Sequence, residues 1–336
     1  MRRSRTVYAT VRAVALATAS LVALSASAAA AEYVKDGRET LAGLLARYDT
    51  LATDHDWQTD AIYRYPAAGG ADIRAWRTRS EGPALWVISG LHGEEPAGPN
   101  AIAQEIEAVA GLAISGVPVV LLPVSNPEAY RRNWRYPNTA ERDWRQGGYS
   151  VGDSEYLLPD LETGTTPRAA RPSGPETEAY TRYVLDLARR YPPLLVIDLH
   201  EDELSTEGGY VYSQGVRADG NPVVAEVTRL LRDSAIPIRG DGRTRFGEPI
   251  VDGVVSRDDR GGPIRDGSID ELLSAREVFV DGRRVPGPSA PTVIVVETPA
   301  YAGSKLELRV GAHAAVVRSL RELWELNRQV LEATPR

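Results

Sequence analysis

The chain contains no cysteine among its 336 residues. Disulfide bonds and a lipid-modified N-terminal cysteine are therefore excluded, and any metal site must be built from histidine and carboxylate ligands. Histidine is also scarce, with four residues in the whole sequence: His55, His92, His200 and His313. This scarcity makes the position of each histidine informative.

Acidic residues are absent from the first 31 positions, which hold four arginines, an apolar run over residues 13–24 and an alanine-rich stretch. This order is typical of a secretory signal peptide. Because the run is shorter than the roughly 20 residues that span a bilayer as a helix, we expect residues 1–31 to be cleaved rather than retained as an anchor. No other stretch has membrane-spanning character. The sequence predicts a periplasmic or secreted protein.

Positive charge is low once this segment is removed. The chain has 39 Lys and Arg against 46 Asp and Glu, and loss of the four arginines gives 35 − 46 = −11. A charge of this sign argues against nucleic acid as a partner. The remaining chain is long enough to bury a large core, and we predict a single catalytic domain over residues 32–336.

Four short apolar runs have the length and β-branched character of buried strands. They cover residues 84–89, 117–124, 194–199 and 292–296. Helical periodicity lies between or after these runs, over residues 36–48, 97–112, 176–191, 223–233 and 306–331. An Asp-x-x-Glu pattern at Asp36 and Glu39 predicts the N-terminal cap of the first helix. Alternating strands and helices predict an α/β fold.

Two stretches rich in Gly, Pro, Asp and Arg interrupt this pattern, over residues 136–174 and 240–270. Long loops inside a compact enzyme domain often shape the active site, although insertions without function are nearly as common. Residues 278–285 are predicted to form a hairpin that turns at Asp281-Gly282.

Two of the four histidines, His92 and His200, follow predicted strands at their carboxyl ends. Open α/β sheets bind ligands at that edge. Glu95 lies three residues after His92, near enough on a turn to share a metal ion with it, and Glu94 is the competing carboxylate. His92, Glu95 and His200 together predict one catalytic zinc ion per chain, with a fourth position open for water or substrate. Metals close to zinc stay open as alternatives.

Two further carboxylates are predicted to belong to this site. Glu297 follows four β-branched residues at the end of a strand, where a carboxylate is costly unless it has a partner or a role. A general base that takes a proton from water and returns it to a leaving amine is such a role. Asp198 shares a strand face with His200 and is interpreted as orienting that imidazole or as meeting a substrate amine. His55 is interpreted as a surface or loop-capping residue, and His313 as an ordinary helix-face residue.

Three segments carry the candidate site residues: residues 90–98 (GLHGEEPAG), 197–201 (IDLHE) and 296–299 (VETP). In this order they resemble the two zinc motifs and the catalytic glutamate segment of the zinc carboxypeptidase family, together with the related succinylglutamate desuccinylase and aspartoacylase group. The resemblance runs from Trp86 to the C-terminus. It implies a zinc hydrolase with a mixed, mostly parallel central sheet and helices on both faces.

The resemblance also implies roles for arginines that lie between the zinc motifs. Residues 126–135 resemble a family segment ending in an arginine that stabilises the oxyanion, which implies that role for Arg135. Ten residues on, the family has an Asn-Arg pair that binds the terminal carboxylate of the substrate, and Trp144 and Arg145 stand at these positions. Arg145, with Arg142 as a substitute, is therefore predicted to bind a substrate carboxylate. Trp144 puts the usual exopeptidase pocket in doubt.

A tyrosine that many family members place before the catalytic glutamate has no counterpart, because no Tyr occurs between Tyr212 and Tyr301. Tyr210, Tyr212 and Tyr301 stay open as substitutes. The short segment after Glu297, 336 − 297 = 39 residues, favours the carboxypeptidase branch, since aspartoacylase-like enzymes carry a sizeable β-rich domain there.

These observations predict an exported zinc metallocarboxypeptidase or peptide amidase that hydrolyses an amide bond near a carboxylate-bearing end. The expected substrates are peptides, including cell-wall peptides, or N-acyl amino acids. One alternative is a deacylase of N-acyl amino acids, like the aspartoacylase group. Another is a pseudoenzyme that binds zinc or peptide without turnover, against which the intact set of candidate site residues argues.

Overall fold

The computed structural model describes most of the chain between residues 36 and 333. The described residues are 36–66, 71–135, 175–202, 205, 207–216, 218–264, 268–281, 283–301 and 304–333. The predicted signal peptide over residues 1–31 and the predicted loop over residues 136–174 lie outside them. In the described part of the chain, no helix is long and apolar enough to cross a membrane.

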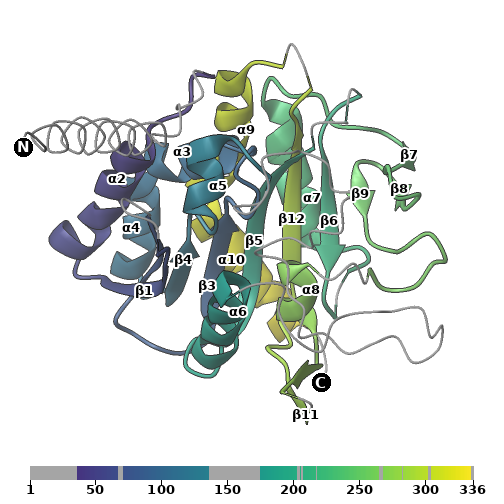
Figure 1. Cartoon of the computed structure of the whole chain (residues 1–336). Coiled ribbons are helices and arrows are strands. Elements are labelled where there is room, and N and C mark those ends of the chain that lie inside the picture. The colour runs from purple at the N-terminus through teal and green to yellow at the C-terminus, as the bar shows by residue number, and fades with distance from the viewer. Residues whose placement is uncertain are drawn as a thin grey trace, which may run out of the picture. The chain divides into compact units, whose positions relative to one another are not determined.

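An eight-stranded mixed sheet forms the centre of the fold (Figure 1). Its strand order is β1-β2-β4-β3-β5-β12-β6-β9. The bounds are β1 Gln58–Arg64, β2 Asp72–Arg77, β3 Ala84–Ser89, β4 Val119–Leu122, β5 Pro193–Asp202, β6 Tyr210–Gln214, β9 Val254–Val255 and β12 Val293–Pro299. Two small antiparallel pairs lie outside the sheet, made of β7 Gly242–Arg243 with β8 Pro249–Ile250, and β10 Glu277–Val280 with β11 Arg283–Pro286.

The four strands at the centre of the sheet run parallel. β4, β3, β5 and β12 pair in this order, and each corresponds to one of the four predicted apolar runs. Every residue of β3 and β4 is buried, which explains why the sequence there is continuously apolar. β1, β2 and β6 add antiparallel pairings at the flanks. The predicted α/β fold class is confirmed.

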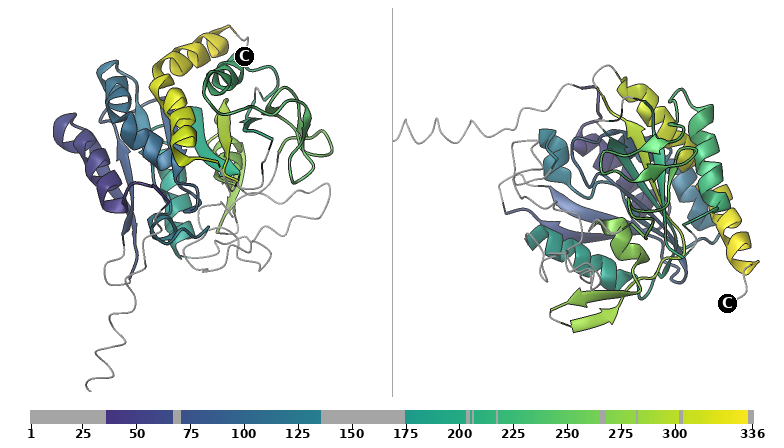
Figure 2. Two further views of the ribbon diagram at one scale, coloured as in Figure 1. Left: turned by 90° about the horizontal axis from the view of Figure 1, so that it is seen from above. Right: turned by 90° about the vertical axis from the view of Figure 1, so that its right-hand side faces the viewer.

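Helices cover both faces of the sheet (Figures 1 and 2). Their bounds are α2 Leu41–Asp54, α3 Ala97–Gln104, α4 Ile106–Ile114, α5 Pro127–Arg132, α6 Pro175–Leu187, α7 Pro222–Asp233, α8 Ile269–Ser274, α9 Leu306–Arg318 and α10 Leu320–Glu332. α6 and α8 pack on one face, where Tyr180 and Leu272 join a core with Trp86 and Val196. α3, α7, α9 and α10 lie on the opposite face, with α3 against β5 and α9 against β12.

The predicted N-cap of the first helix is wrong. Thr40 caps α2, because its side-chain oxygen accepts a hydrogen bond from the backbone N–H of Gly43 at 3.1 Å. Asp36 lies ahead of the helix and forms an ion pair with Arg38. The buried guanidinium of Arg38 binds the carboxylate of Asp36, so this carboxylate does not cap the helix. The Asp-x-x-Glu pattern therefore does not mark the start of the helix.

Two long predicted helices are each divided in two. The helix expected over residues 97–112 is interrupted at Glu105, and the one expected over residues 306–331 is interrupted at Ser319. The two helices on either side of each break both bury an apolar face within the same layer of helices. Apolar periodicity therefore continues across both breaks, and the sequence does not mark them.

The flanking strands β1 and β2 carry no long apolar run and were not predicted. Alternate residues of β2, among them Ile73 and Ala75, face the core. Ion pairs join the two strands, with Arg64 and Asp72 at 2.8 Å. A strand buried on one face retains charged residues on the other, so a search for continuous apolar runs misses it.

The predicted hairpin over residues 278–285 is confirmed as β10 and β11. The stretch over residues 240–270, predicted as loop, contains the short strands β7, β8 and β9 in its described part. β9 pairs with β6 and extends the sheet. This stretch therefore belongs in part to the sheet.

Gly98 allows α3 to lie close against the sheet. A Cβ atom on Gly98 would lie 2.2 Å from Oγ of Ser89 and 2.9 Å from Cβ of Leu199. We expect Gly98→Ala to lower the free energy of unfolding by about 1–3 kcal/mol, the usual cost of overpacking. In the control Gly111→Ala, where a Cβ would meet nothing within 4 Å, helix propensity predicts stabilisation by roughly 0.5–1 kcal/mol. Urea unfolding of both variants checks the prediction, and equal effects would contradict it.

Candidate metal centre

The turn after β3 brings two polar side chains together. Gly90 has a φ of +62°, in the left-handed region that favours glycine, and the chain leaves β3 sharply there. His92 and Glu95 follow before α3 begins, and both are buried. Nδ1 of His92 lies 2.8 Å from Oε1 of Glu95. The turn thus forms the pairing that the spacing of three residues predicted.

His200 reaches the same carboxylate from β5. Its Nδ1 lies 3.0 Å from Oε2 of Glu95, and its ring centroid lies 5.1 Å from that of His92. The candidate ligand atoms of the three residues all lie within 4.8 Å of one another. β3 and β5 are parallel neighbours, so both histidines emerge at one edge of the sheet. The structure therefore brings together the three predicted metal ligands.

These three side chains fit a divalent metal ion. Two imidazole nitrogens face the two oxygens of one carboxylate, a donor set that zinc and neighbouring transition metals accept. Burial, followed by the charge of Arg135, lowers the pKa of His92 to about 3, so this imidazole is neutral, as a ligand must be. Burial opposes ionisation of Glu95, but its hydrogen bonds with His92 and His200 and the charge of His200 outweigh burial and hold the pKa of Glu95 well below its usual value.

Asp198 contacts His200 on the side away from Glu95. Oδ1 of Asp198 lies 3.3 Å from Nε2 of His200, at ion-pair distance but without hydrogen-bond alignment. Burial opposes a charge on His200, yet Asp198 and Glu95 raise its pKa well above the usual value, opposite to the shift at His92. A metal ion needs the neutral imidazole, so it would compete with this proton. Asp198 lies beside the ring nitrogen of His200 that faces away from Glu95, and its orienting role stays a prediction.

Glu95, rather than Glu94, faces the histidines. Oε1 of Glu94 accepts a hydrogen bond from Nη1 of Arg135 at 3.0 Å. The same nitrogen lies 3.2 Å from Oε1 of Glu95. Arg135, whose side chain is largely buried, therefore stands directly beside the candidate metal ligands.

Glu297 occupies the strand next to His200. The two residues are partners in the parallel pairing of β12 with β5, so their side chains leave the sheet on the same face. Burial of its carboxyl raises the pKa of Glu297 well above the usual value; His200 opposes this shift, and Glu95 and Asp202 add to it. The structure places Glu297 next to the candidate metal ligands, as predicted.

No protein-family model matches the chain, and no curated protein matches it in sequence. Solved structures do match it. A candidate metallopeptidase from Shewanella amazonensis is 19% identical, with a TM-score of 0.62 over 84% of this chain and 92% of that chain. Carboxypeptidase A from Helicoverpa armigera is 13% identical, with a TM-score of 0.57 over 96% of this chain and 81% of that chain. The chain has the metallocarboxypeptidase fold.

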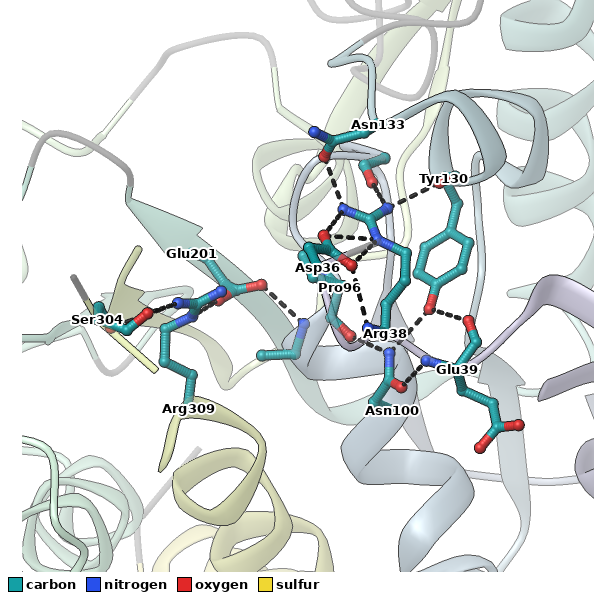
Figure 3. A network of polar contacts seen from close by, with 12 residues as sticks. Asp36, Arg38, Glu39, Pro96, Asn100, Tyr130, Asn133, Glu201, Ser304 and Arg309 are labelled. Atoms are coloured by element: carbon teal, nitrogen blue, oxygen red, sulfur yellow. Dashed lines mark hydrogen bonds and ion pairs between the residues drawn. The ribbon is translucent and has the colours of Figure 1, made fainter. Parts of the chain in front are cut away.

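Glu201, whose buried carboxylate lies on the other face of β5, contacts the candidate metal ligand Glu95 through its backbone and α9 through its side chain; Figure 3 shows its pairing with Arg309. The backbone N–H of Glu201 donates to Oε2 of Glu95 at 3.2 Å. Its carboxylate accepts a hydrogen bond from the backbone N–H of Ala97 in α3 at 2.7 Å and pairs with Arg309 of α9. Glu201 thus connects Glu95 to two helices. Arg309 was not predicted as a site residue, because a helical pattern in the sequence does not show which cation faces inward.

His313 is a second polar residue that α9 directs at the sheet. His313 lies in α9, as predicted, on the face of the helix that is buried against the sheet, with Nε2 3.0 Å from Oγ1 of Thr298. Burial lowers its pKa to about 3, so it is neutral. Because Thr298 follows Glu297, this contact anchors the end of β12. His55 instead ends α2 and lies 3.6 Å from Glu107, in the capping position expected for it.

Tyr210 and Tyr212 lie in β6, the strand that pairs with β12 beside Glu297. Tyr210 is the strand partner of Glu297, and its hydroxyl donates to Oδ2 of Asp202 at 2.8 Å. The hydroxyl of Tyr212 donates to Oε2 of Glu248 at 2.7 Å. Of the tyrosines left open by the sequence, Tyr210 is therefore the one adjacent to the candidate base.

The residues predicted to bind the substrate carboxylate, Arg142 and Arg145, lie outside the described residues, as does Trp144. Their role stays a prediction. The described part of the site contains the candidate metal ligands, the candidate base and Arg135.

Proposed function

We propose that the protein is an exported zinc-dependent metallocarboxypeptidase or peptide amidase. The observation that carries this proposal is the convergence of His92, Glu95 and His200 beside Glu297, at the carboxyl edge of parallel strands. The metallocarboxypeptidase fold supports it. The substrates are peptides that carry a carboxylate near the scissile amide bond.

His92, Glu95 and His200 would hold one zinc ion. When bound, zinc supplies a Lewis acid that polarises a carbonyl group and lowers the pKa of water. The chain itself fixes the ligands before the ion arrives. Oε2 of Glu95 accepts a hydrogen bond from the backbone of Glu201, and Oε1 accepts one from Arg135. This support reduces the rearrangement that metal binding requires.

Glu297 transfers the proton in the proposed reaction. It takes a proton from the attacking water and delivers it to the nitrogen of the leaving amine, while the C–N bond breaks. A carboxyl whose pKa lies above its usual value accepts the first proton more readily than an ordinary glutamate does. Its pairing with His200 across the sheet keeps it next to the ligands.

Arg135 stabilises the negative charge that develops on the carbonyl oxygen. Its hydrogen bonds to Glu94 and Glu95 hold the guanidinium in place before the substrate binds, which is the condition for effective electrostatic stabilisation. Arg145, with Arg142 as a substitute, binds the substrate carboxylate through two parallel hydrogen bonds.

The proposed route to the substrate is export. Residues 1–31 direct the chain across the membrane and are removed, leaving an acidic protein without a membrane anchor. Cell-wall peptides are then accessible substrates, whereas nucleic acid is not a partner. Mass spectrometry of the secreted protein checks this part of the proposal through the position of the new N-terminus.

Metal content and substrate range test the enzymatic proposal together. Purified residues 32–336 are expected to contain about one zinc ion per chain and to hydrolyse members of a peptide panel that includes γ-linked and D-amino-acid bonds. Turnover of N-acyl amino acids alone would instead identify a deacylase. Absence of both metal and turnover after addition of zinc would contradict the proposal and leave a binding protein with this fold.

A further inference from the structure

Arg38 is a buried arginine whose donors are all used (Figure 3). Its side chain is 1% exposed. Nε and Nη2 bind the carboxylate of Asp36 at 2.7–3.0 Å. Nη1 donates to the backbone oxygens of Gly93 at 2.8 Å and Tyr130 at 2.7 Å, and Nη2 also donates to Oδ1 of Asn133 at 2.6 Å. One guanidinium therefore joins three segments that are far apart in the sequence.

The partners of Arg38 are the two segments that carry catalytic groups. Gly93 directly follows the candidate ligand His92, in the turn that ends at Glu95. Asn133 ends α5 with a φ of +54° and lies two residues before Arg135. The backbone N–H of Gly93 also donates to the backbone oxygen of Arg135 at 3.3 Å. Arg38 thus fixes the position of the metal-binding turn relative to the oxyanion-stabilising arginine.

The two segments are in close contact, with no space for a side chain at Gly93. A Cβ atom on Gly93 would lie 2.0 Å from the backbone carbon of Ala129 in α5. The guanidinium of Arg38 lies 4.8 Å from the centre of the Tyr130 ring, whose hydroxyl donates to the backbone oxygen of Glu39 at 2.9 Å. Residues 36–39 therefore pack directly against the two segments that carry the candidate site residues.

Hydrogen-bond geometry makes arginine necessary at this position. A buried guanidinium is tolerated where every N–H finds an acceptor, as here. Lysine offers three donors from a single nitrogen and cannot reach the carboxylate, the two backbone oxygens and the amide oxygen together. A change to lysine would retain the charge but release part of the network.

We infer that Arg38 is a positioning residue of the active site, which sets the distance between Arg135 and the pair formed by His92 and Glu95. The inference rests on the proposed function. It adds to that function a requirement for residues 36–39, which lie outside all three motif segments. The segment ahead of α2 is thereby a working part of the catalytic site.

The test compares Arg38→Lys with Arg77→Lys. Arg77 is also buried, pairs with Asp60 at 2.7 Å and faces the ring of Tyr191, but it lies in β2 away from the site. Cobalt(II) added to metal-free protein reports ligand geometry through its visible spectrum, and steady-state kinetics report kcat and KM. We expect Arg38→Lys to shift the cobalt spectrum and to lower kcat roughly 10–100-fold with little change in KM, as for residues that orient ligands. Arg77→Lys should lower thermal stability and leave the spectrum and kcat unchanged.

The outcomes separate this inference from the proposed function. If wild-type protein binds cobalt and hydrolyses peptide while Arg38→Lys changes only thermal stability, the inference is overturned and the function stands. If wild-type protein neither binds cobalt nor turns over substrate, both are overturned. Should Arg38→Lys fail to fold, Asp36→Asn retains the guanidinium and weakens its anchor. A smaller change of the same kind supports the inference, and an unchanged spectrum and kcat overturn it.

Discussion

His200→Ala is expected to abolish metal binding and hydrolysis together. The substitution leaves two of the three candidate ligands, His92 and Glu95, and removes the nitrogen that lies 3.0 Å from Oε2 of Glu95. Because metal-ion catalysis contributes several kcal/mol and each 1.36 kcal/mol corresponds to a factor of ten, kcat/KM should fall on the order of 10³-fold or more. Metal analysis by mass spectrometry and rate measurements on the same sample check both parts.

The control for this experiment is His55→Ala. His55 ends α2, away from the candidate site, and lies 3.6 Å from Glu107. The His55→Ala variant should retain one metal ion per chain and the wild-type rate of hydrolysis. Retention of a full complement of zinc by His200→Ala would contradict the assigned ligand set.

Glu297→Gln should lower kcat while the protein keeps its metal ion. The amide has nearly the size of the carboxylate but cannot accept the proton of the attacking water. General acid–base catalysis contributes about 10²–10⁴-fold, and we expect kcat to fall within that range. KM should change little, because no substrate contact is assigned to this side chain.

Metal content distinguishes a base from a ligand in this variant. Glu297 is the strand partner of His200 but is not among the three residues whose ligand atoms lie within 4.8 Å of one another. Loss of zinc from Glu297→Gln would therefore move the residue into the ligand set. An unchanged kcat would remove it from the reaction altogether.

The central strands and the convergence of the candidate metal ligands could be predicted from the sequence for one physical reason. Parallel strands buried on both faces require continuous apolar runs, so a polar residue at the end of such a run is conspicuous. His92, His200 and Glu297 all stand at these ends. The edge where parallel strands finish is shared, so the three side chains could be expected to meet before any contact was known.

The supporting residues could not be predicted in the same way. Arg38, Arg309 and His313 lie in segments where polar residues are ordinary, and only the packing of the chain turns them inward. β1 and β2 were missed because strands with one polar face resemble loops in composition. The breaks at Glu105 and Ser319 leave apolar periodicity intact, so they too depend on the folded arrangement.

β5 is a strand of ten residues whose successive side chains point to opposite faces of the sheet. Asp198 and His200 point to the face that carries the chemistry, and Leu199 and Glu201 point to the opposite face, toward α3. Inserting or deleting one residue within β5 would turn the side chains that follow the change to the opposite face of the sheet. Variation in chain length among natural homologues should therefore be absent from β5 and fall instead in stretches such as residues 240–270, where a change of length leaves both sets in place.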